Sequence, residues 1–217
     1  MGIALFDLDN TLIAGDSDYL WGCFLVEQGI VDGPRYEQAN RRFYDQYKVG
    51  ELDIHEFLAF QLRPLAEHDL TLLQRWRMQY VEEMIVPILL PKARQLIERH
   101  REQGDTLAVI TATNSFITRP IVDLYGIEHL LATEPEQVAG RYTGGVAGIP
   151  CFQDGKVTVL EGWLAGRQQS LEDSSFYSDS HNDLPLLSRV TRPTAVNPDE
   201  ILEAHARQLN WPVISLR

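Results

Sequence analysis

Four short apolar runs of strand length, separated by helical patterns, constrain the fold of this chain most. The runs are residues 3–6 (IALF), 106–111 (TLAVIT), 175–178 (SFYS) and 194–197 (TAVN). The first two are the strongest, and the second is rich in β-branched residues. Short strands that alternate with helices are typical of a mainly parallel sheet that is covered on both faces. The sequence therefore predicts an α/β fold.

Proline and glycine mark the ends of the helices between these runs. Residues 91–104 open with a proline and close with a glycine, which predicts a helix with its C-terminal cap. A second helix is expected to run to Tyr125, with Gly126 closing it and Pro120 near its start. A two-stranded excursion is expected near residues 137–143, around an Ala-Gly turn.

Residues 14–86 show helical periodicity without an intervening strand. Apolar side chains such as Trp21 and Phe24 recur there at helical spacing. We therefore expect two domains: an α/β core of residues 1–13 and 87–217, and a small helical domain of residues 14–86 inserted after the first strand.

Composition excludes several classes of protein. The net charge of −12 disfavours nucleic acid as a partner, and the 217 residues contain no apolar run of the ~20 residues that a membrane helix needs. Asp7 and Asp9 stand where a signal peptide would carry basic residues, and Cys23 and Cys151 are too few for a disulfide framework. We expect a cytoplasmic protein that acts on a small molecule, and we make no prediction of its oligomeric state.

Polar side chains follow three of the predicted strands. They are Asp7 and Asp9 after the first strand, Thr111, Thr113 and Asn114 after the second, and Asp179, Asn182 and Asp183 after the third. Parallel strands bring such positions together at one edge of the sheet, and carboxylate oxygens suit Mg²⁺. Either acidic cluster alone is equally well explained as a turn or a helix cap. Both together favour a magnesium site.

The motifs around these residues resemble those of the haloacid dehalogenase-like hydrolases. Asp7, Asp9 and Thr11 match the D-x-D-x-T motif of that family, and the strand end at Thr111 resembles its second motif. Lys156 resembles the third motif, and residues 179–183 (DSHND) match the D-x-x-x-D of the fourth. The resemblance covers the whole chain in the right order, and it implies a Rossmann-like core with an inserted helical cap of the C1 type.

Two residues depart from the family pattern. Ser178 stands where the fourth motif usually has glycine, and Ala112 follows Thr111 where phosphoserine phosphatases have a small, glycine-rich pair. The second departure weakens an identification with phosphoserine phosphatase.

The resemblance implies a role for each motif. Asp7 would be the nucleophile that forms an aspartyl-phosphate, and Asp9 the general acid and base. Thr111 and Lys156 would hold the phosphoryl oxygens. Dehalogenases of this family lack a counterpart of Asp9, so its presence argues for a phosphatase or a phosphotransferase. Taken alone, Lys156 is more simply a solvated residue at a helix start.

The same resemblance implies the metal ligands. Mg²⁺ would be held by Asp7, by the main-chain carbonyl of Asp9 and by Asp179, with Asp183 nearby.

The inserted helices would supply substrate specificity. Asp16 matches the spacing of an acid that binds the substrate ammonium in phosphoserine phosphatases, and Asp18 lies close by; helix capping explains either acid equally well. We also expect Asn114, Asn182 and Arg42 to contact substrate. These residues favour a small phosphorylated amino alcohol, with histidinol phosphate first and phosphoserine second.

Three rival functions remain open at this stage. A phosphoaspartate receiver shares an acidic cluster, a threonine and a lysine, but it lacks a helical insert of this length. A degenerate Mg²⁺-binding member of the family without turnover keeps every motif, and a phosphotransferase differs only in its acceptor.

Overall fold

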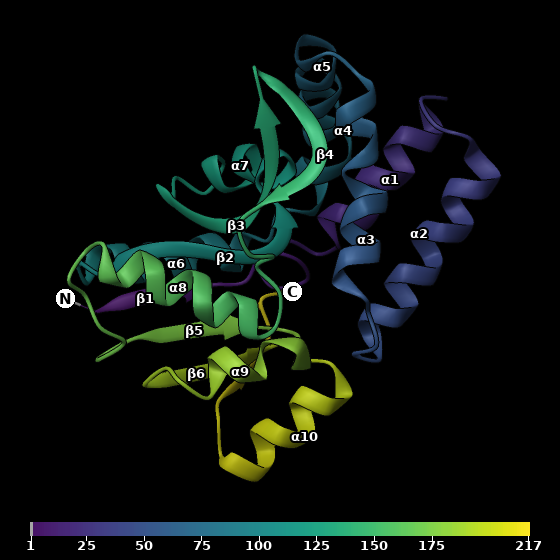
Figure 1. Cartoon of the computed structure of the whole chain (residues 1–217). Helices are drawn as coiled ribbons and strands as arrows, with labels where there is room; N and C mark the ends of the chain where they lie inside the picture. The colour runs from purple at the N-terminus through teal and green to yellow at the C-terminus, as the bar shows by residue number, and fades with distance from the viewer. Residues whose placement is uncertain (1) are drawn as a thin grey trace.

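The computed structural model describes residues 2–217, which form a seven-stranded sheet in the order β4-β3-β2-β1-β5-β6-β7 (Figure 1). All neighbouring strands are parallel except the antiparallel pair β3 and β4. The strands are β1 Ile3–Phe6, β2 Thr106–Asn114, β3 His129–Val138, β4 Arg141–Ala147, β5 Ser175–Ser178, β6 Arg192–Val196 and β7 Val213–Ile214. The predicted α/β class with a mainly parallel sheet is confirmed.

Four strands differ from the expectation. Strand β2 continues beyond the expected residues 106–111 to Asn114, so Thr113 and Asn114 lie within it and not after it. The antiparallel excursion is longer than residues 137–143, because β3 begins at His129 as a parallel neighbour of β2 before it turns into the hairpin. The strand expected at residues 194–197 begins two residues earlier, at Arg192. The short edge strand β7 has no counterpart in the prediction, since two residues carry too little pattern.

Helices cover both faces of the sheet. In the core they are α6 Pro91–Glu102, α7 Ser115–Asp123, α8 Asp154–Ala165, α9 Leu184–Leu187 and α10 Glu200–Leu209. Strand β1 shows why its four residues are all apolar: Ala4 and Phe6 pack with α6 and α7, whereas Ile3 and Leu5 pack with α8, α9 and α10. Successive side chains of a strand point to opposite faces, so a strand buried on both faces needs a continuous apolar run.

The segment between β1 and α6 is helical, as expected. It contains α1 Ser17–Glu27, α2 Gly33–Lys48, α3 Ile54–Gln61, α4 Arg63–Glu67, α5 Leu70–Tyr80, a π-helical turn Val81–Ile85 and a 3-10 turn Val86–Ile88. Figure 1 shows α1 to α5 as a group of helices beside the sheet. A single antiparallel bridge pairs Ile13 with Leu89, so the insert leaves and rejoins the core at one place. The exact domain boundaries remain a prediction.

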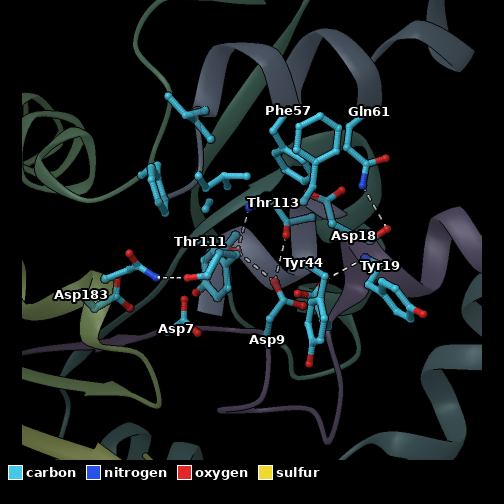
Figure 2. Close-up of a pocket in the computed structure, with 18 of the residues that line it drawn as sticks. Asp7, Asp9, Asp18, Tyr19, Tyr44, Phe57, Gln61, Thr111, Thr113 and Asp183 are labelled. Carbon is cyan, nitrogen blue, oxygen red and sulfur yellow. Dashed lines mark hydrogen bonds between the residues drawn. The ribbon is translucent and has the colours of Figure 1, made fainter. Parts of the chain in front are cut away.

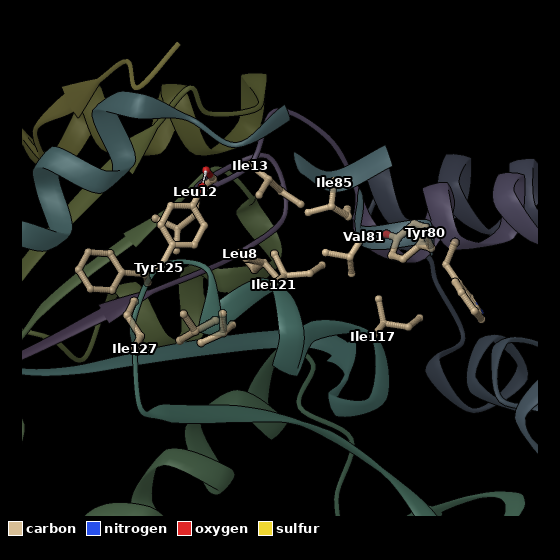
Figure 3. Close-up of a cluster of buried hydrophobic side chains, with 14 of the residues drawn as sticks. Leu8, Leu12, Ile13, Tyr80, Val81, Ile85, Ile117, Ile121, Tyr125 and Ile127 are labelled. Atoms are coloured by element: carbon tan, nitrogen blue, oxygen red, sulfur yellow. Dashed lines mark hydrogen bonds between the residues drawn. The ribbon is translucent and has the colours of Figure 1, made fainter. Parts of the chain in front are cut away.

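Buried side chains join the helical insert to the core at this crossing. Leu8 and Ile13, which follow β1, belong to one apolar cluster with Ile85 and with Ile121 of α7 (Figure 3). The β3–β4 hairpin also contacts the insert, where Nη1 of Arg141 lies 3.1 Å from the carboxylate of Asp69. No helix among residues 2–217 is both long and apolar enough to cross a membrane.

The expected position of Pro120 near the start of its helix was wrong, because Pro120 lies inside α7. Proline has no main-chain N–H, so the carbonyl of Phe116 four residues earlier loses its helical donor. The side chain of Arg77 replaces that donor: its Nη1 donates to the Phe116 carbonyl oxygen at 2.8 Å, and its guanidinium lies 4.7 Å from the centroid of the Phe116 ring. A contact from another helix therefore makes the internal proline tolerable.

We expect Arg77→Met to lower the free energy of unfolding by about 1–3 kcal/mol, because it leaves the buried Phe116 carbonyl without a donor. Urea unfolding of the single variant, of Pro120→Ala and of the double variant measures this. Alanine at position 120 restores a main-chain N–H, so Arg77→Met should cost less in that background. An equal cost in both backgrounds would show that the carbonyl is not the reason.

Candidate active site

Three neighbouring strands deliver acidic and hydroxyl side chains to one edge of the sheet. Phe6 at the end of β1 pairs with Val109 of β2 and with Tyr177 of β5. The N–H of Asp7 extends this ladder by donating to the Tyr177 carbonyl at 2.9 Å. Asp7, Thr111 and the residues after β5 therefore meet at the carboxyl ends of parallel strands, where α/β proteins bind their ligands.

Lys156 lies between the carboxylates of Asp7 and Asp183 at this edge of the sheet. Its Nζ is 2.7 Å from Oδ1 of Asp7 and 2.7 Å from Oδ1 of Asp183, and all three side chains are buried. Burial lowers the pKa of Lys156, but the charges of Asp183 and Asp7 outweigh it and raise that pKa above its usual value. Lys156 is therefore a buried cation at the start of α8 and not a solvated residue.

The structure gives a role to Ser178, which stands where the fourth motif usually has glycine. Its hydroxyl donates to Oδ2 of Asp183 at 2.6 Å, which glycine could not do. The serine therefore supplies a second donor to the carboxylate that also binds Lys156.

The carboxylate of Asp9, the second acid after β1, accepts hydrogen bonds from three donors. Its Oδ1 accepts the main-chain N–H of Ser17 at 2.6 Å, and its Oδ2 accepts the hydroxyls of Thr113 at 2.9 Å and Thr111 at 3.4 Å. Burial and then the charge of Asp16 raise the pKa of Asp9 to about 6 against these hydrogen bonds. A carboxyl group with a pKa near the working pH is suited to both giving and taking a proton.

Asp7 is also shifted towards neutral pH. Burial raises its pKa to about 7, with further increases from the charges of Asp183 and Asp9 and an opposing effect of Lys156. The folded protein therefore holds Asp7 in a site where negative charge exceeds positive charge.

The donor set fits a hard cation such as Mg²⁺. Thr11 Oγ1 lies 3.3 Å from both Asp7 Oδ2 and Asp179 Oδ1, which places these two carboxylates on either side of one hydroxyl. Burial, and then the charges of Asp7 and Asp183, raise the pKa of Asp179 well above its usual range. A divalent cation would relieve this repulsion. Within residues 2–217, however, no three acid, histidine or cysteine side chains are already grouped as metal ligands.

A cavity opens from these acids toward the helical insert (Figure 2). The core contributes Asp7, Asp9, Thr111, Ala112, Thr113, Phe152, Lys156, Asn182 and Asp183. The insert contributes Asp16, Asp18, Tyr19, Asn40, Phe43, Tyr44, Tyr47, Leu52, Ile54, Phe57 and Gln61. The insert thus supplies the aromatic wall and two further acids.

The structure brings most of the predicted substrate-binding residues to this cavity. Asp16 lines it and also caps α1, since its Oδ1 accepts the N–H of Tyr19 at 2.8 Å. The two readings of Asp16 from the sequence are therefore compatible. Asn182 lines the cavity too, and its Nδ2 donates to the carbonyl of Tyr47 at 3.1 Å, which ties α2 to the core.

Two predicted residues lie elsewhere. Asn114 is buried and caps α7 by accepting the N–H of Ile117 at 3.3 Å, so its side chain serves the helix and does not line the cavity. Arg42 pairs with Glu56 at 2.6 Å, with half of its side chain exposed. Nothing in the geometry supports contact of either side chain with substrate, and we drop both from the candidate site.

Sequence reasoning missed several wall residues. Tyr47, Phe57, Gln61 and Phe152 line the cavity but belong to no motif. The aromatic spacing along α1 and α2 was visible, but it did not separate cavity-lining rings from core rings such as Trp21, which packs on Phe24.

Comparisons with known proteins agree with this geometry. The model of the family described as haloacid dehalogenase-like hydrolase matches residues 4–188. A protein of Neisseria meningitidis serogroup C (strain 8013), named histidinol-phosphatase, is 43% identical over 99% of both chains. A crystal structure of a protein of unknown function from Bordetella pertussis Tohama I is also 43% identical, covers 99% of this chain and 98% of that one, and superimposes with a TM-score of 0.93.

A phosphoserine phosphatase solved with an analogue of its phospho-aspartyl intermediate shares the fold, at a TM-score of 0.73 and 18% identity over 100% of this chain and 93% of that one. The motif order, the cavity and the full-length matches lead to one family. The chain belongs to the haloacid dehalogenase-like hydrolases and is a phosphatase among them.

Proposed function

We propose that this phosphatase hydrolyses histidinol phosphate. The observation that carries the proposal is the charge of the cavity wall. Five carboxylates line it, those of Asp7, Asp9, Asp16, Asp18 and Asp183. The only lysine or arginine among the described lining residues is Lys156. Lys156 is already paired with Asp7 and Asp183, so the described lining offers no unpaired lysine or arginine to a substrate carboxylate.

This wall separates the two substrates that the sequence favours. Phosphoserine carries a carboxylate, which would lie unpaired among acids at a large energetic cost. Histidinol phosphate carries an ammonium group and an imidazole ring but no carboxylate. The name of the Neisseria relative supports the same choice.

We further propose that the reaction proceeds in two steps on Asp7. A carboxylate oxygen of Asp7 attacks phosphorus, the bond from phosphorus to the ester oxygen breaks, and Asp9 gives its proton to the leaving alcohol. Water then attacks phosphorus, Asp9 takes a proton from that water, and the bond to Asp7 breaks. Thr111 and Lys156 hold phosphoryl oxygens while charge moves across the group.

Mg²⁺ is the proposed cofactor, with Asp7, Asp179 and Asp183 as the side chains that would hold it. It would supply positive charge that lets one anion, the carboxylate, approach another, the phosphate. We also propose that the enzyme acts in the cytoplasm, where two free cysteines remain reduced.

Phosphate release from a panel of phosphomonoesters in the presence of Mg²⁺ tests the function. The panel contains histidinol phosphate, phosphoserine, glycerol phosphate and a nucleotide, and a glycerol acceptor reports phosphotransfer. We expect kcat/KM for histidinol phosphate to lie within about 10⁴–10⁸ M⁻¹s⁻¹ and to exceed that for phosphoserine at least about 100-fold. Equal or faster hydrolysis of phosphoserine would contradict the proposal, and phosphorylated glycerol as the main product would favour a phosphotransferase.

A further inference from the structure

The carboxylate of Asp18 is buried in the cavity wall with an unused acceptor. The residue is 6% exposed, and its Oδ1 has no hydrogen-bond partner. The Thr113 hydroxyl lies nearby, but its single proton is donated to Oδ2 of Asp9 at 2.9 Å. Buried carboxylates are almost always paired with a cation or a donor. The unpaired oxygen is therefore a candidate acceptor for an N–H group of a bound ligand.

Other helices of the insert hold Asp18 in place. Its main-chain carbonyl accepts Nε2 of Gln61 at 3.2 Å, and Oε1 of Gln61 accepts the Tyr36 hydroxyl at 3.1 Å. The preceding carbonyl, of Ser17, accepts the Tyr80 hydroxyl at 2.7 Å. Residues of α2, α3 and α5 thus position the first turn of α1, and a fixed carboxylate can discriminate between ligands better than a mobile one.

Asp18 lies in the part of the cavity wall away from the reacting group. Burial, and then the charges of Asp16 and Asp9, raise its pKa well above the usual range. Figure 2 shows Asp18 at the end of the site where Phe57 lies, away from Asp7. Asp18 is therefore suited to contact a part of the substrate that lies away from the phosphate.

The position of Asp18 matches the part of the proposed substrate that lies farthest from the phosphate. In histidinol phosphate the ammonium is on the second carbon from the ester oxygen, and the ring is attached through the third. Resting on the proposed function, we propose that Asp18 accepts a ring N–H of the imidazole while Asp16 binds the ammonium, so that Asp18 selects substrates that carry the ring. Phe43 and Phe57, whose rings meet edge to face at 5.4 Å, give the imidazole an apolar wall.

Two substrates separate the roles of these acids. Histidinol phosphate carries both groups, and O-phosphoethanolamine carries the ammonium without the ring. We expect Asp18→Asn to lower kcat/KM for histidinol phosphate roughly 10- to 100-fold, mainly through KM, and to affect phosphoethanolamine much less. Asp16→Asn should lower kcat/KM for both substrates by similar factors. Asp45→Asn, at an exposed acid of α2 outside the cavity, is the matched control and should change neither.

Each outcome bears on one proposal. Equal losses of Asp18→Asn on both substrates would overturn the ring assignment while leaving the proposed function intact. Failure of the unmodified enzyme to hydrolyse histidinol phosphate would overturn the proposed function instead. Binding of histidinol, which lacks the phosphate, gives a second measurement by calorimetry: Asp18→Asn should weaken it about 10-fold or more relative to the unmodified protein, and unchanged affinity would contradict the ring assignment. Circular dichroism and the remaining phosphoethanolamine hydrolysis confirm that the variants are folded.

Discussion

Asp7→Asn lowers kcat for histidinol phosphate by about 10⁴-fold or more, because the amide of asparagine cannot act as the nucleophile. The change is nearly isosteric, and Lys156 keeps its second partner, Asp183, at 2.7 Å. Phosphate release under saturating substrate and Mg²⁺ measures the effect. A loss below about 10-fold would show that Asp7 does not form the covalent intermediate.

The same variant should fold at least as stably as the unmodified protein. Burial raises the pKa of Asp7 to about 7, so its carboxyl group is more easily protonated in the folded than in the unfolded chain. A raised carboxyl pKa costs stability as the pH rises from the unfolded value of about 4 through the folded value. Asparagine carries no charge and removes that cost, so thermal unfolding at pH 8 in EDTA should occur at an equal or higher temperature. A large drop in that temperature would mean that the lost activity reflects misfolding.

Lys156→Met has the second large effect, because it removes the one cation between two buried acids. Breaking a buried ion pair at one partner typically costs about 3–5 kcal/mol, and we expect a loss of that size in the free energy of unfolding at pH 8. The pKa of Lys156 is raised, so its stabilising charge is fully present below about 10.4 and is lost only at higher pH. We also expect kcat/KM to fall by about 100- to 1,000-fold, because a phosphoryl ligand is lost.

The pH dependence of this variant follows from the acids that it leaves behind. Burial raises the pKa of Asp7 to about 7, so Asp7 is charged at pH 8 and protonated at pH 5, and the variant should be less destabilised at pH 5. Lys156→Met combined with Asp183→Asn should recover much of the stability without recovering activity. Lys92→Met, at an exposed lysine, is the matched control and should change stability by less than about 0.5 kcal/mol. Urea unfolding at both pH values measures all three, and a loss that does not depend on pH would contradict the electrostatic explanation.

The sequence predicted the sheet core and the family well because both depend on local pattern. Apolar runs of four to six residues that alternate with helical segments favour strands of a parallel sheet, and acids directly after such strands emerge at the same sheet edge. Longer-range features were harder to predict. Pro120 was expected near the helix start because the sequence does not show that Arg77 supplies a donor from another helix. The start of β3 and the two residues of β7 were missed for lack of pattern.

The candidate site divides in the same way. Asp7, Asp9, Thr111 and Asp179 were identified by their order along the chain: Asp7 and Asp179 directly follow β1 and β5, Asp9 comes two residues after Asp7, and Thr111 lies within β2, three residues before its end. Their catalytic and metal-binding roles stay predictions that the variants above test. The substrate-binding residues were less well predicted: Asp16 and Asp18 line the cavity, whereas Arg42, named from its charge alone, pairs with Glu56 on the surface.

By itself, then, the sequence determined the class of fold, the family and the acidic edge of the sheet, because strand ends and their motifs are set within a few residues. Only the tertiary structure decided which side chains share the cavity. Lys156 reaches Asp7 across 149 residues of chain, and the residues whose hydrogen bonds position Asp18 come from three different helices of the insert. The partners of a buried charge depend on how distant segments pack, and burial then sets both the charge that each group carries and the ligand that it can accept.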